Sequence, residues 1–306
     1  MAEHEERGKS MKNQQTIRQV VTKDSLLGAL KDVGARPGMV IEVHSSLSAL
    51  GYVAGGARTV VDALMELCGD SGTILMPMQT GDNTDPSGWE NPPVDPALWQ
   101  VLRDNTPPYH PENTDIQYMG AIPENFRHRN GVVYSGHPSL SYAAWGKYAR
   151  LLCNRQSIHF PLAEESPTAR LYELRGYVLL IGTGYDKCTC MHLAEYRTDC
   201  RPIRVDCAAA AEGEENRWRK YLDLALDNGE FEKIGAIMER KAWSARPCSM
   251  TARSASSRLW MPLMKPPNIL KKPLCTICTV KLTSDAAPMP KRLLPRPAAF
   301  LFPPFP

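Results

Sequence analysis

The chain has 306 residues, of which 43% are hydrophobic and 23% charged, enough to bury the core of one or two domains. No run approaches the roughly 18 uncharged apolar residues of a membrane helix, and the first fifteen residues, which we expect to form a flexible tail, lack the apolar stretch of a secretory signal. This composition argues against a membrane-spanning or secreted protein and favours the cytoplasm. The nine cysteines are an odd number without regular spacing, which predicts reduced thiols and not a disulfide framework.

The net charge of +3 conceals two unlike segments. Residues 1–240 hold 32 acidic and 25 basic side chains, whereas residues 241–306 hold 11 basic side chains, one acid, 12 prolines and no glycine. The second segment shows no sustained helical or strand period. We therefore predict an irregular, basic, Pro-rich tail over 241–306, either disordered or produced by a shifted reading frame. The alternative is a basic arm that binds nucleic acid or an acidic membrane; we expect neither partner.

Strands and helices alternate in the first part of the chain. Leu26, Leu27 and Leu30 recur at helical spacing after Asp24 or Ser25 as a cap, which predicts a helix that ends near Gly34. The pattern continues with a β-branched strand over 39–44, a helix over 57–69 and a strand over 72–77. This alternation predicts an α/β fold in which residues 16–240 form one sandwich-like domain, with a central mixed, partly parallel sheet flanked by helices.

Residues 79–111 form a long segment rich in Pro, Asp and Asn. A connection of this length inside a compact domain usually acts as a lid or binding loop. Beyond it, the pattern predicts a helix within 119–129, a strand and turn within 131–146, a helix over 146–153 and a buried strand over 177–182.

The stretch "GTGYDKCTCMHLAEY" begins at residue 182, where the last of these strands ends. Thr189 suits an N-cap, which would place His192 at the third helical position and Glu195 three residues later on the same face. Ligands collect at the carboxyl ends of strands in α/β sheets, and a helix N-terminus favours neutral imidazole over imidazolium. The spacing predicts that His192 acts as a general base and that Glu195 fixes its tautomer.

Two other interpretations of this stretch remain open. Cys188, Cys190 and His192 are possible metal ligands, and Cys275 and Cys278 could complete a set. However, C-x-C-x-H across a helix start directs the side chains apart, and structural zinc sites usually use C-x(2–4)-C pairs; we expect no metal. The second alternative is that His192 is an interior histidine that caps a helix.

Polar and glycine-rich positions near the first strand carry weaker signals. Ser45 and Ser46 follow "MVIEVH" and either donate hydrogen bonds to a ligand or cap the next turn. Gly55 and Gly56 lack the spacing of either common phosphate-binding motif and fit a tight strand-to-helix turn. The absence of a G-x-S-x-G elbow leaves a serine hydrolase without support.

Four separated segments resemble the aminoglycoside 3-N-acetyltransferase family: "VHSSLSALGYVAGGARTVVDALMELCGDSGTILMPMQTGD", "MGAIPENFRHRNGVVYSGHPSLSYAAWGKYA", "EESPTARLYEL" and "VLLIGTGYDKCTCMHLAEYR". The resemblance covers about residues 16–240. It implies direct transfer of an acetyl group from acetyl-coenzyme A to the 3-amino group of a 2-deoxystreptamine aminoglycoside, which confers antibiotic resistance. His192 would deprotonate the amine and Glu195 would orient His192. The positions implied to line the coenzyme A channel are His44, Ser45, Ser46, Gly55, Gly56, Met119 and Gly120.

An aminoglycoside carries several ammonium groups, which an acidic cleft would concentrate. Our candidates in the long segment are Asp82, Asp85 and Glu90, with solvated loop carboxylates as the alternative. His137 fits a turn or channel residue and not the base.

The chain departs from the family pattern at Cys188 and Cys190 and, more seriously, after residue 240, where the family's closing elements do not follow. Two alternatives to the active enzyme therefore stay open: an inactive relative that only binds coenzyme A, and an acetyltransferase that acts on another primary amine. We also expect a possible homodimer.

Overall fold

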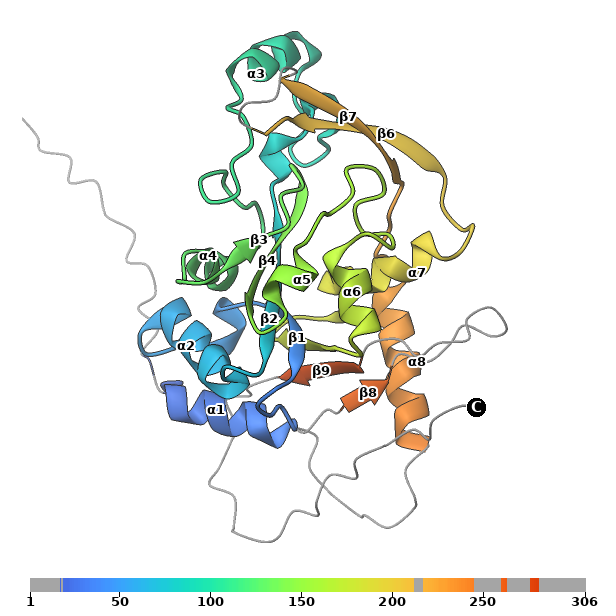
Figure 1. The fold of residues 1–306 in the computed structure, drawn as a ribbon. Helices are drawn as coiled ribbons and strands as arrows, with labels where there is room; N and C mark the ends of the chain where they lie inside the picture. The colour runs from blue at the N-terminus through green and yellow to red at the C-terminus, as the bar shows by residue number, and fades with distance from the viewer. Residues whose placement is uncertain (1–16, 18, 212–216, 245–259, 263–275, 281–306) are drawn as a thin grey trace, which may run out of the picture.

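The computed structural model describes residues 17, 19–211, 217–244, 260–262 and 276–280 (Figure 1). Its main sheet consists of β1 (Val40–Ser45), β2 (Thr73–Gln79), β3 (Val133–Tyr134), β4 (Leu140–Gly146), β5 (Tyr177–Ile181), β8 (Trp260–Pro262) and β9 (Thr276–Val280). The strand order is β3-β4-β2-β1-β5-β9-β8. β2, β1, β5 and β9 run parallel, and β3-β4, β4-β2 and β9-β8 are antiparallel pairs. The predicted mixed, partly parallel α/β sheet is confirmed.

β1 lies at the centre of the sheet, between β2 and β5. The chain leaves β1 toward β2 on one side, whereas β5 returns on the other, so the carboxyl end of β1 is a switch point of the topology. Ser45 stands opposite Ile181 in the register. Because both strands run in the same direction, the loops that follow Ser45 and Ile181 leave the sheet at the same edge.

Helices cover both faces of this sheet (Figure 1). One face, which includes Val43 and Leu179, is covered by α1 (Lys23–Asp32), α2 (Gly56–Cys68) and α4 (Ala121–Arg127). The other face, which includes Val178 and Leu180, is covered by α5 (Ala149–Leu152), α6 (Pro167–Glu173), α7 (Leu193–Tyr196) and α8 (Phe231–Ser244). Alternate residues of each strand thus serve two cores, which explains the continuous apolar run in β5 and the burial of side chains on both faces of β1.

The cap of the first predicted helix differs from the sequence-based expectation, whereas the start of the second agrees with it. α1 is capped by Thr22, whose hydroxyl oxygen accepts from the Ser25 backbone N–H, and not by Asp24 or Ser25 as predicted. The reason is a capping box, in which the Ser25 hydroxyl also accepts from the Thr22 backbone N–H. α2 begins after Gly55, which has a φ of 80°, a conformation that glycine adopts without strain.

The long segment predicted over 79–111 contains short helices: η2 (Gly81–Asn83), η3 (Pro86–Gly88), η4 (Pro96–Leu98) and α3 (Trp99–Asn105). A two-stranded ribbon, β6 (Ile203–Ala209) and β7 (Trp218–Leu224), holds it. The Trp218 indole donates to the Arg103 carbonyl at 3.1 Å, and the Asp85 N–H donates to the Cys207 carbonyl at 2.8 Å. Figure 1 shows the ribbon and α3 together at the top of the molecule.

The structure describes only part of the segment 241–306: the end of α8 and the strands β8 and β9. β9 pairs with β5 in parallel and β8 pairs with β9, so these two short pieces are regular where we predicted an irregular tail. The rest of the predicted tail, and the predicted flexible residues 1–15, lie outside the described residues. Among the described helices, none combines the length and apolar character needed to cross a membrane.

Candidate active site

The turn that carries His192 follows β5 as two 3₁₀ segments, η5 (Tyr185–Lys187) and η6 (Thr189–His192), and then α7. The predicted Thr189 cap is wrong: Cys188 is the N-cap of η6 without a side-chain hydrogen bond, and His192 is both the last residue of η6 and the N-cap of α7. Backbone groups satisfy the turn instead, because the Met191 N–H donates to the Cys188 carbonyl at 3.0 Å. His192 therefore lies at the junction of two short helices and not at the third position of one helix, as predicted.

His192 and Glu195 face each other at the start of α7. The distance from His192 Nδ1 to Glu195 Oε2 is 2.5 Å, and Glu195 is buried while 16% of the His192 side chain is exposed. An ionised carboxylate only accepts hydrogen bonds, so Nδ1 carries the proton and the lone pair lies on Nε2. Within the described residues, Nε2 has no hydrogen-bond partner. This arrangement can accept a proton from a bound molecule.

The second oxygen of Glu195 is also occupied. Arg201 Nε donates to Glu195 Oε1 at 2.6 Å. Burial by itself would raise the pKa of Glu195, but the hydrogen bonds from His192 and Arg201 outweigh it and hold that pKa below its usual value. Glu195 is thus a carboxylate with both oxygens in use, one by the imidazole and one by a guanidinium.

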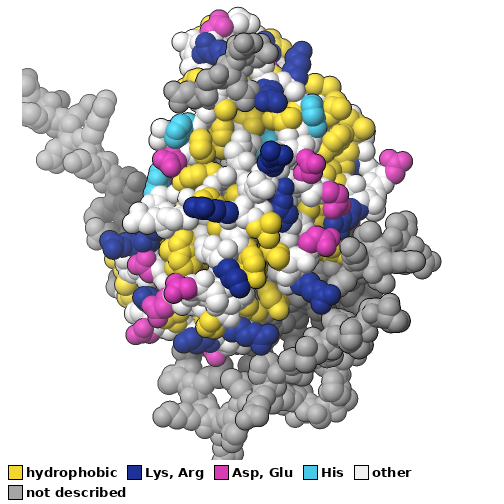
Figure 2. All heavy atoms as spheres, viewed as in Figure 1, with side chains coloured by type: hydrophobic (Ala, Val, Ile, Leu, Met, Phe, Trp, Pro, Cys, Tyr) yellow, Lys and Arg dark blue, Asp and Glu magenta, His cyan; other side chains and the backbone are white. Residues whose placement is uncertain are grey.

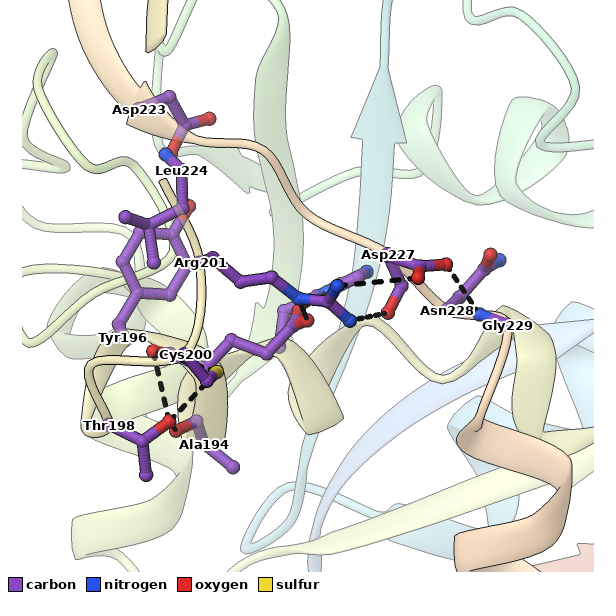
Figure 3. Close-up of polar contacts among 12 residues, drawn as sticks. Ala194, Tyr196, Thr198, Cys200, Arg201, Asp223, Leu224, Asp227, Asn228 and Gly229 are labelled. Carbon is purple, nitrogen blue, oxygen red and sulfur yellow. Dashed lines mark hydrogen bonds and ion pairs between the residues drawn. The ribbon is translucent and has the colours of Figure 1, made fainter. Parts of the chain in front are cut away.

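Residues from two further segments complete the surroundings of the histidine. The Phe231 ring, at the start of α8, lies 4.8 Å from the His192 ring between centroids. Arg201 also reaches Asp227, with its Nη2 3.3 Å from the Asp227 carbonyl oxygen; Figure 3 shows these two residues joined across the loops. The sequence interpretation missed Arg201, Asp227 and Phe231. The one available signal was that a buried Glu195 needs a second donor.

The predicted serines lie at the edge where this turn begins. The Ser45 Oγ atom is buried and has no hydrogen-bond partner among the residues that the structure describes, which is uncommon for a buried hydroxyl. Ser46 donates its N–H to the Ile181 carbonyl at 2.9 Å, and its hydroxyl lies 3.2 Å from that of Ser48. The structure therefore brings the end of β1 and the turn after β5 to one edge of the sheet.

His44 lies apart from the serines. Its Nε2 is 2.9 Å from Glu42 Oε1, and both side chains are buried. Because successive side chains of a strand point to opposite faces, His44 faces the α6 side while Ser45 faces the α2 side.

The predicted glycines open two neighbouring helices, since α2 packs against α4. Gly55 caps α2 and Gly120 caps α4, both at positive φ, and neither glycine has a side chain that could cap its helix. Gly56 is the first residue of α2, and the half-buried Met119 directly precedes Gly120. The Gly56 N–H donates to the Val53 carbonyl at 2.9 Å; other backbone N–H groups in the first turn of a helix are donors that an anionic or carbonyl ligand can use.

The three predicted acidic side chains differ in their surroundings. Asp85 accepts two hydrogen bonds from Arg103, each of 2.9 Å, which together with bonds from Ser87 lower its pKa to about 2. Asp82 accepts one hydrogen bond from Gln117 at 2.6 Å, and Glu90 is exposed. Asp82 and Glu90 have more free acceptor capacity than Asp85.

Other candidate residues from the sequence have local roles. Cys188 and Cys190 are buried with sulfurs 3.3 Å apart. In the described part of the chain, no group of three or more His, Cys, Asp or Glu side chains could hold a metal ion; Cys275 lies outside that part. His137 is a turn residue as predicted, because its Nδ1 accepts from the N–H groups of Ser139 and Leu140.

Comparison with known proteins gives one family. Residues 43–260 match the family model described as aminoglycoside 3-N-acetyltransferase. The chain is 39% identical over 219 residues to the SPbeta prophage-derived aminoglycoside N(3')-acetyltransferase-like protein YokD of Bacillus subtilis, which covers 71% of this chain and 80% of YokD.

Solved structures agree with the sequence match. The crystal structure of YokD superposes with a TM-score of 0.69, covering 75% of this chain and 83% of YokD at 38% identity. AAC-IIIb in binary complex with CoASH matches at a TM-score of 0.63 and 27% identity, covering 73% of this chain and 86% of that chain. AAC-VIa bound to sisomicin matches at a TM-score of 0.61 and 27% identity, covering 75% of this chain and 88% of that chain.

Proposed function

Because the chain belongs to the aminoglycoside 3-N-acetyltransferase family, we propose that the His192–Glu195 site transfers the acetyl group of acetyl-coenzyme A to the 3-amino group of a 2-deoxystreptamine aminoglycoside. The observation that carries this proposal is the orientation of His192: Nδ1 is bound to Glu195 and Nε2 is free within the described residues. A free imidazole nitrogen beside a fixed carboxylate is the arrangement that a general base needs.

His192 accepts a proton through Nε2 as the substrate amine attacks. The amine nitrogen forms a bond to the thioester carbonyl carbon, and the carbon–sulfur bond breaks with its electron pair going to sulfur. Glu195 stabilises the positive charge that His192 gains, because its Oε2 stays hydrogen-bonded to Nδ1. His192 then returns its proton to the leaving thiolate or to water, which restores the neutral ring.

Coenzyme A binds, in this proposal, along the edge formed by the end of β1 and the starts of α2 and α4. Three observations support it: the hydroxyl of Ser45, which has no partner among the described residues, the helix starts at Gly55 and Gly120, where the N-cap residue has no side chain, and the related AAC-IIIb structure with CoASH. Ser46 and Gly56 belong to the same edge. His44 contributes less directly, since its Nε2 is held by Glu42.

The aminoglycoside approaches from the side of the long segment, where Asp82 and Glu90 are open to ammonium groups. AAC-VIa, a structural relative, binds sisomicin. Asp85 supports the shape of this segment through Arg103 and is not a primary ammonium partner in this proposal. The cytoplasmic location, the possible homodimer and the absence of a nucleic-acid partner stay predictions.

The test measures acetyl transfer to several aminoglycosides by wild type, His192→Ala and Glu195→Gln. The release of the coenzyme A thiol reports the rate. We expect kcat to fall by ~10²–10⁴-fold for His192→Ala, the range for loss of a general base, with the Kd of coenzyme A unchanged. The kcat of Glu195→Gln should fall less, because the amide still orients the imidazole ring but does not stabilise its positive charge.

A matched control is His128→Ala. His128 also pairs with a glutamate, Glu124, at 3.0 Å, but on the surface, so we expect its loss to leave kcat unchanged. A wild-type protein that binds coenzyme A but acetylates no aminoglycoside would be the inactive relative, and acetylation of simpler amines alone would identify the other alternative. Full activity of His192→Ala would remove His192 from the mechanism.

A further inference from the structure

We propose that Arg201 is a positioning residue for the His192–Glu195 pair and sets the pH at which His192 becomes a base. This inference rests on the proposed function for its kinetic test but not for its spectroscopic one. Arg201 lies in the loop after α7, six residues beyond Glu195, and contacts the carboxylate oxygen that the imidazole leaves free.

Two loops hold Arg201 in place. Its Nε donates to Glu195 Oε1 at 2.6 Å, its Nη2 lies 3.3 Å from the Asp227 carbonyl oxygen, and its Nη1 lies 3.3 Å from Asp227 Oδ2 (Figure 3). Asp227 is itself fixed, because its Oδ1 accepts from the Gly229 N–H at 2.8 Å. The same loop leads into Phe231, which packs on the His192 ring. Arg201 thus connects the carboxylate to the segment that confines the imidazole.

The charge of Arg201 affects His192 through Glu195. Glu195 stabilises imidazolium, and a guanidinium bound to the other oxygen withdraws part of that stabilisation. The charged groups that face the pair come from three segments: Glu195 on α7, Arg201 after it and Asp227 before α8. Tyr196 faces Asp223 instead, and burial raises the pKa of its phenol, so it stays neutral. Loss of Arg201 therefore leaves Glu195 a stronger partner for protonated His192.

The experiment compares wild type with Arg201→Gln. We expect the acidic limb of the kcat/KM profile to move to higher pH by about 0.5–1 unit, because more base is needed to deprotonate the imidazole. We also expect kcat at high pH to fall by about tenfold, in the range for loss of a group that orients a functional histidine through its partner, with KM for acetyl-coenzyme A unchanged. Arg201→Lys keeps the charge, so the acidic limb of its kcat/KM profile should lie at the wild-type pH. Its kcat should lie between those of wild type and Arg201→Gln.

An NMR titration of the His192 imidazole, assigned with His192→Ala, gives a readout that needs no turnover. The same upward shift is expected in Arg201→Gln and not in Arg201→Lys. If wild type proves inactive while this shift is present, the proposed function fails and the role of Arg201 stands. If Arg201→Gln does not fold, Arg201→Met removes the same charge while keeping a long side chain, and it should produce the same upward shift.

Arg197 is the matched control. It binds Glu164 with two hydrogen bonds of 2.6 and 2.8 Å and stacks over Tyr172, so Arg197→Gln removes the same charge from a similar ion pair near the site. We expect it to lower thermal stability and leave the pH limb in place. An unchanged His192 titration in Arg201→Gln, or an equal shift in Arg197→Gln, would overturn the inference.

Discussion

His137 shows how burial sets the protonation of a single side chain. The ring is 2% exposed, its Nδ1 accepts from two backbone N–H groups, and its Nε2 donates to the Ile158 carbonyl. Burial lowers the pKa of His137 from 6.5 to about 4, so the folded protein holds it neutral. Asp85 is the opposite case, because Arg103 keeps it ionised. Both side chains are hydrogen-bonded within the protein, so we assign them structural roles.

The depressed pKa of His137 predicts a pH-dependent stability. The unfolded chain binds a proton near pH 6.5 and the folded chain only near pH 4, so this contribution is complete above pH 6.5 and is lost as pH falls toward 4. The free energy of unfolding of wild type should therefore fall by up to about 3 kcal/mol more over this range than that of His137→Asn. Urea unfolding at several pH values measures this difference in the free energy of unfolding. His128→Asn, at an exposed site, should keep the wild-type slope; parallel wild-type and His137→Asn curves would contradict the prediction.

At the scale of the element, α8 connects the histidine to the second core. Its first residue, Phe231, contacts the His192 ring, and Tyr185 in η5 donates to Glu239 at 3.2 Å. Gly235 allows this close approach, because a Cβ added there would meet the Tyr185 ring. α8 is therefore both a core helix and the wall of the site, so its docking should affect stability and activity together.

Gly235→Ala should lower the free energy of unfolding by about 1–3 kcal/mol, since the added methyl overpacks a filled contact. It should also reduce kcat, because displacement of α8 moves Phe231 away from His192. Gly28→Ala in α1 is the control: a Cβ there meets nothing within 4 Å, so the same change should stabilise the protein by about 0.5–1 kcal/mol. Chemical denaturation distinguishes the two, and a loss of stability in both would contradict the packing argument.

For the whole molecule, the order of the strands decides which edges of the sheet are protected. β9 pairs along β5 from Tyr177 to Ile181, so β5 is not an edge strand. An uncovered β5 would present an apolar strand with unpaired backbone groups, which favours association between chains. Charges elsewhere counteract association, because basic and acidic side chains are interspersed on the face in Figure 2.

Truncation after Ser244 removes β8 and β9 and should lower the thermal midpoint and cause aggregation. Truncation after Val280 retains both strands and should behave like the full chain. Light scattering and thermal unfolding of the two truncated forms measure the difference. Equal stability of the shorter form would instead support the sequence-based prediction that the domain ends near residue 240.

The sequence by itself determined what depends on near neighbours in the chain. The apolar periods located β1, β2, β5 and the helices between them, and the spacing of His192 and Glu195 placed both on one side of a helical turn. These features follow from local backbone geometry, in which residues three apart meet regardless of the rest of the fold. The prediction that Thr189 caps this turn was wrong, because a backbone hydrogen bond from the Met191 N–H to the Cys188 carbonyl closes it instead.

Only the tertiary structure decided which distant groups meet. Arg201 completes the hydrogen bonding of Glu195, Phe231 confines His192, and Arg103 occupies the carboxylate of Asp85. None of these pairs has a periodic or motif signal, because a buried carboxylate accepts a donor from any segment that packing brings near. The order of the strands was also beyond the local pattern, since it depends on how the connections cross the sheet and not on the residues within each strand.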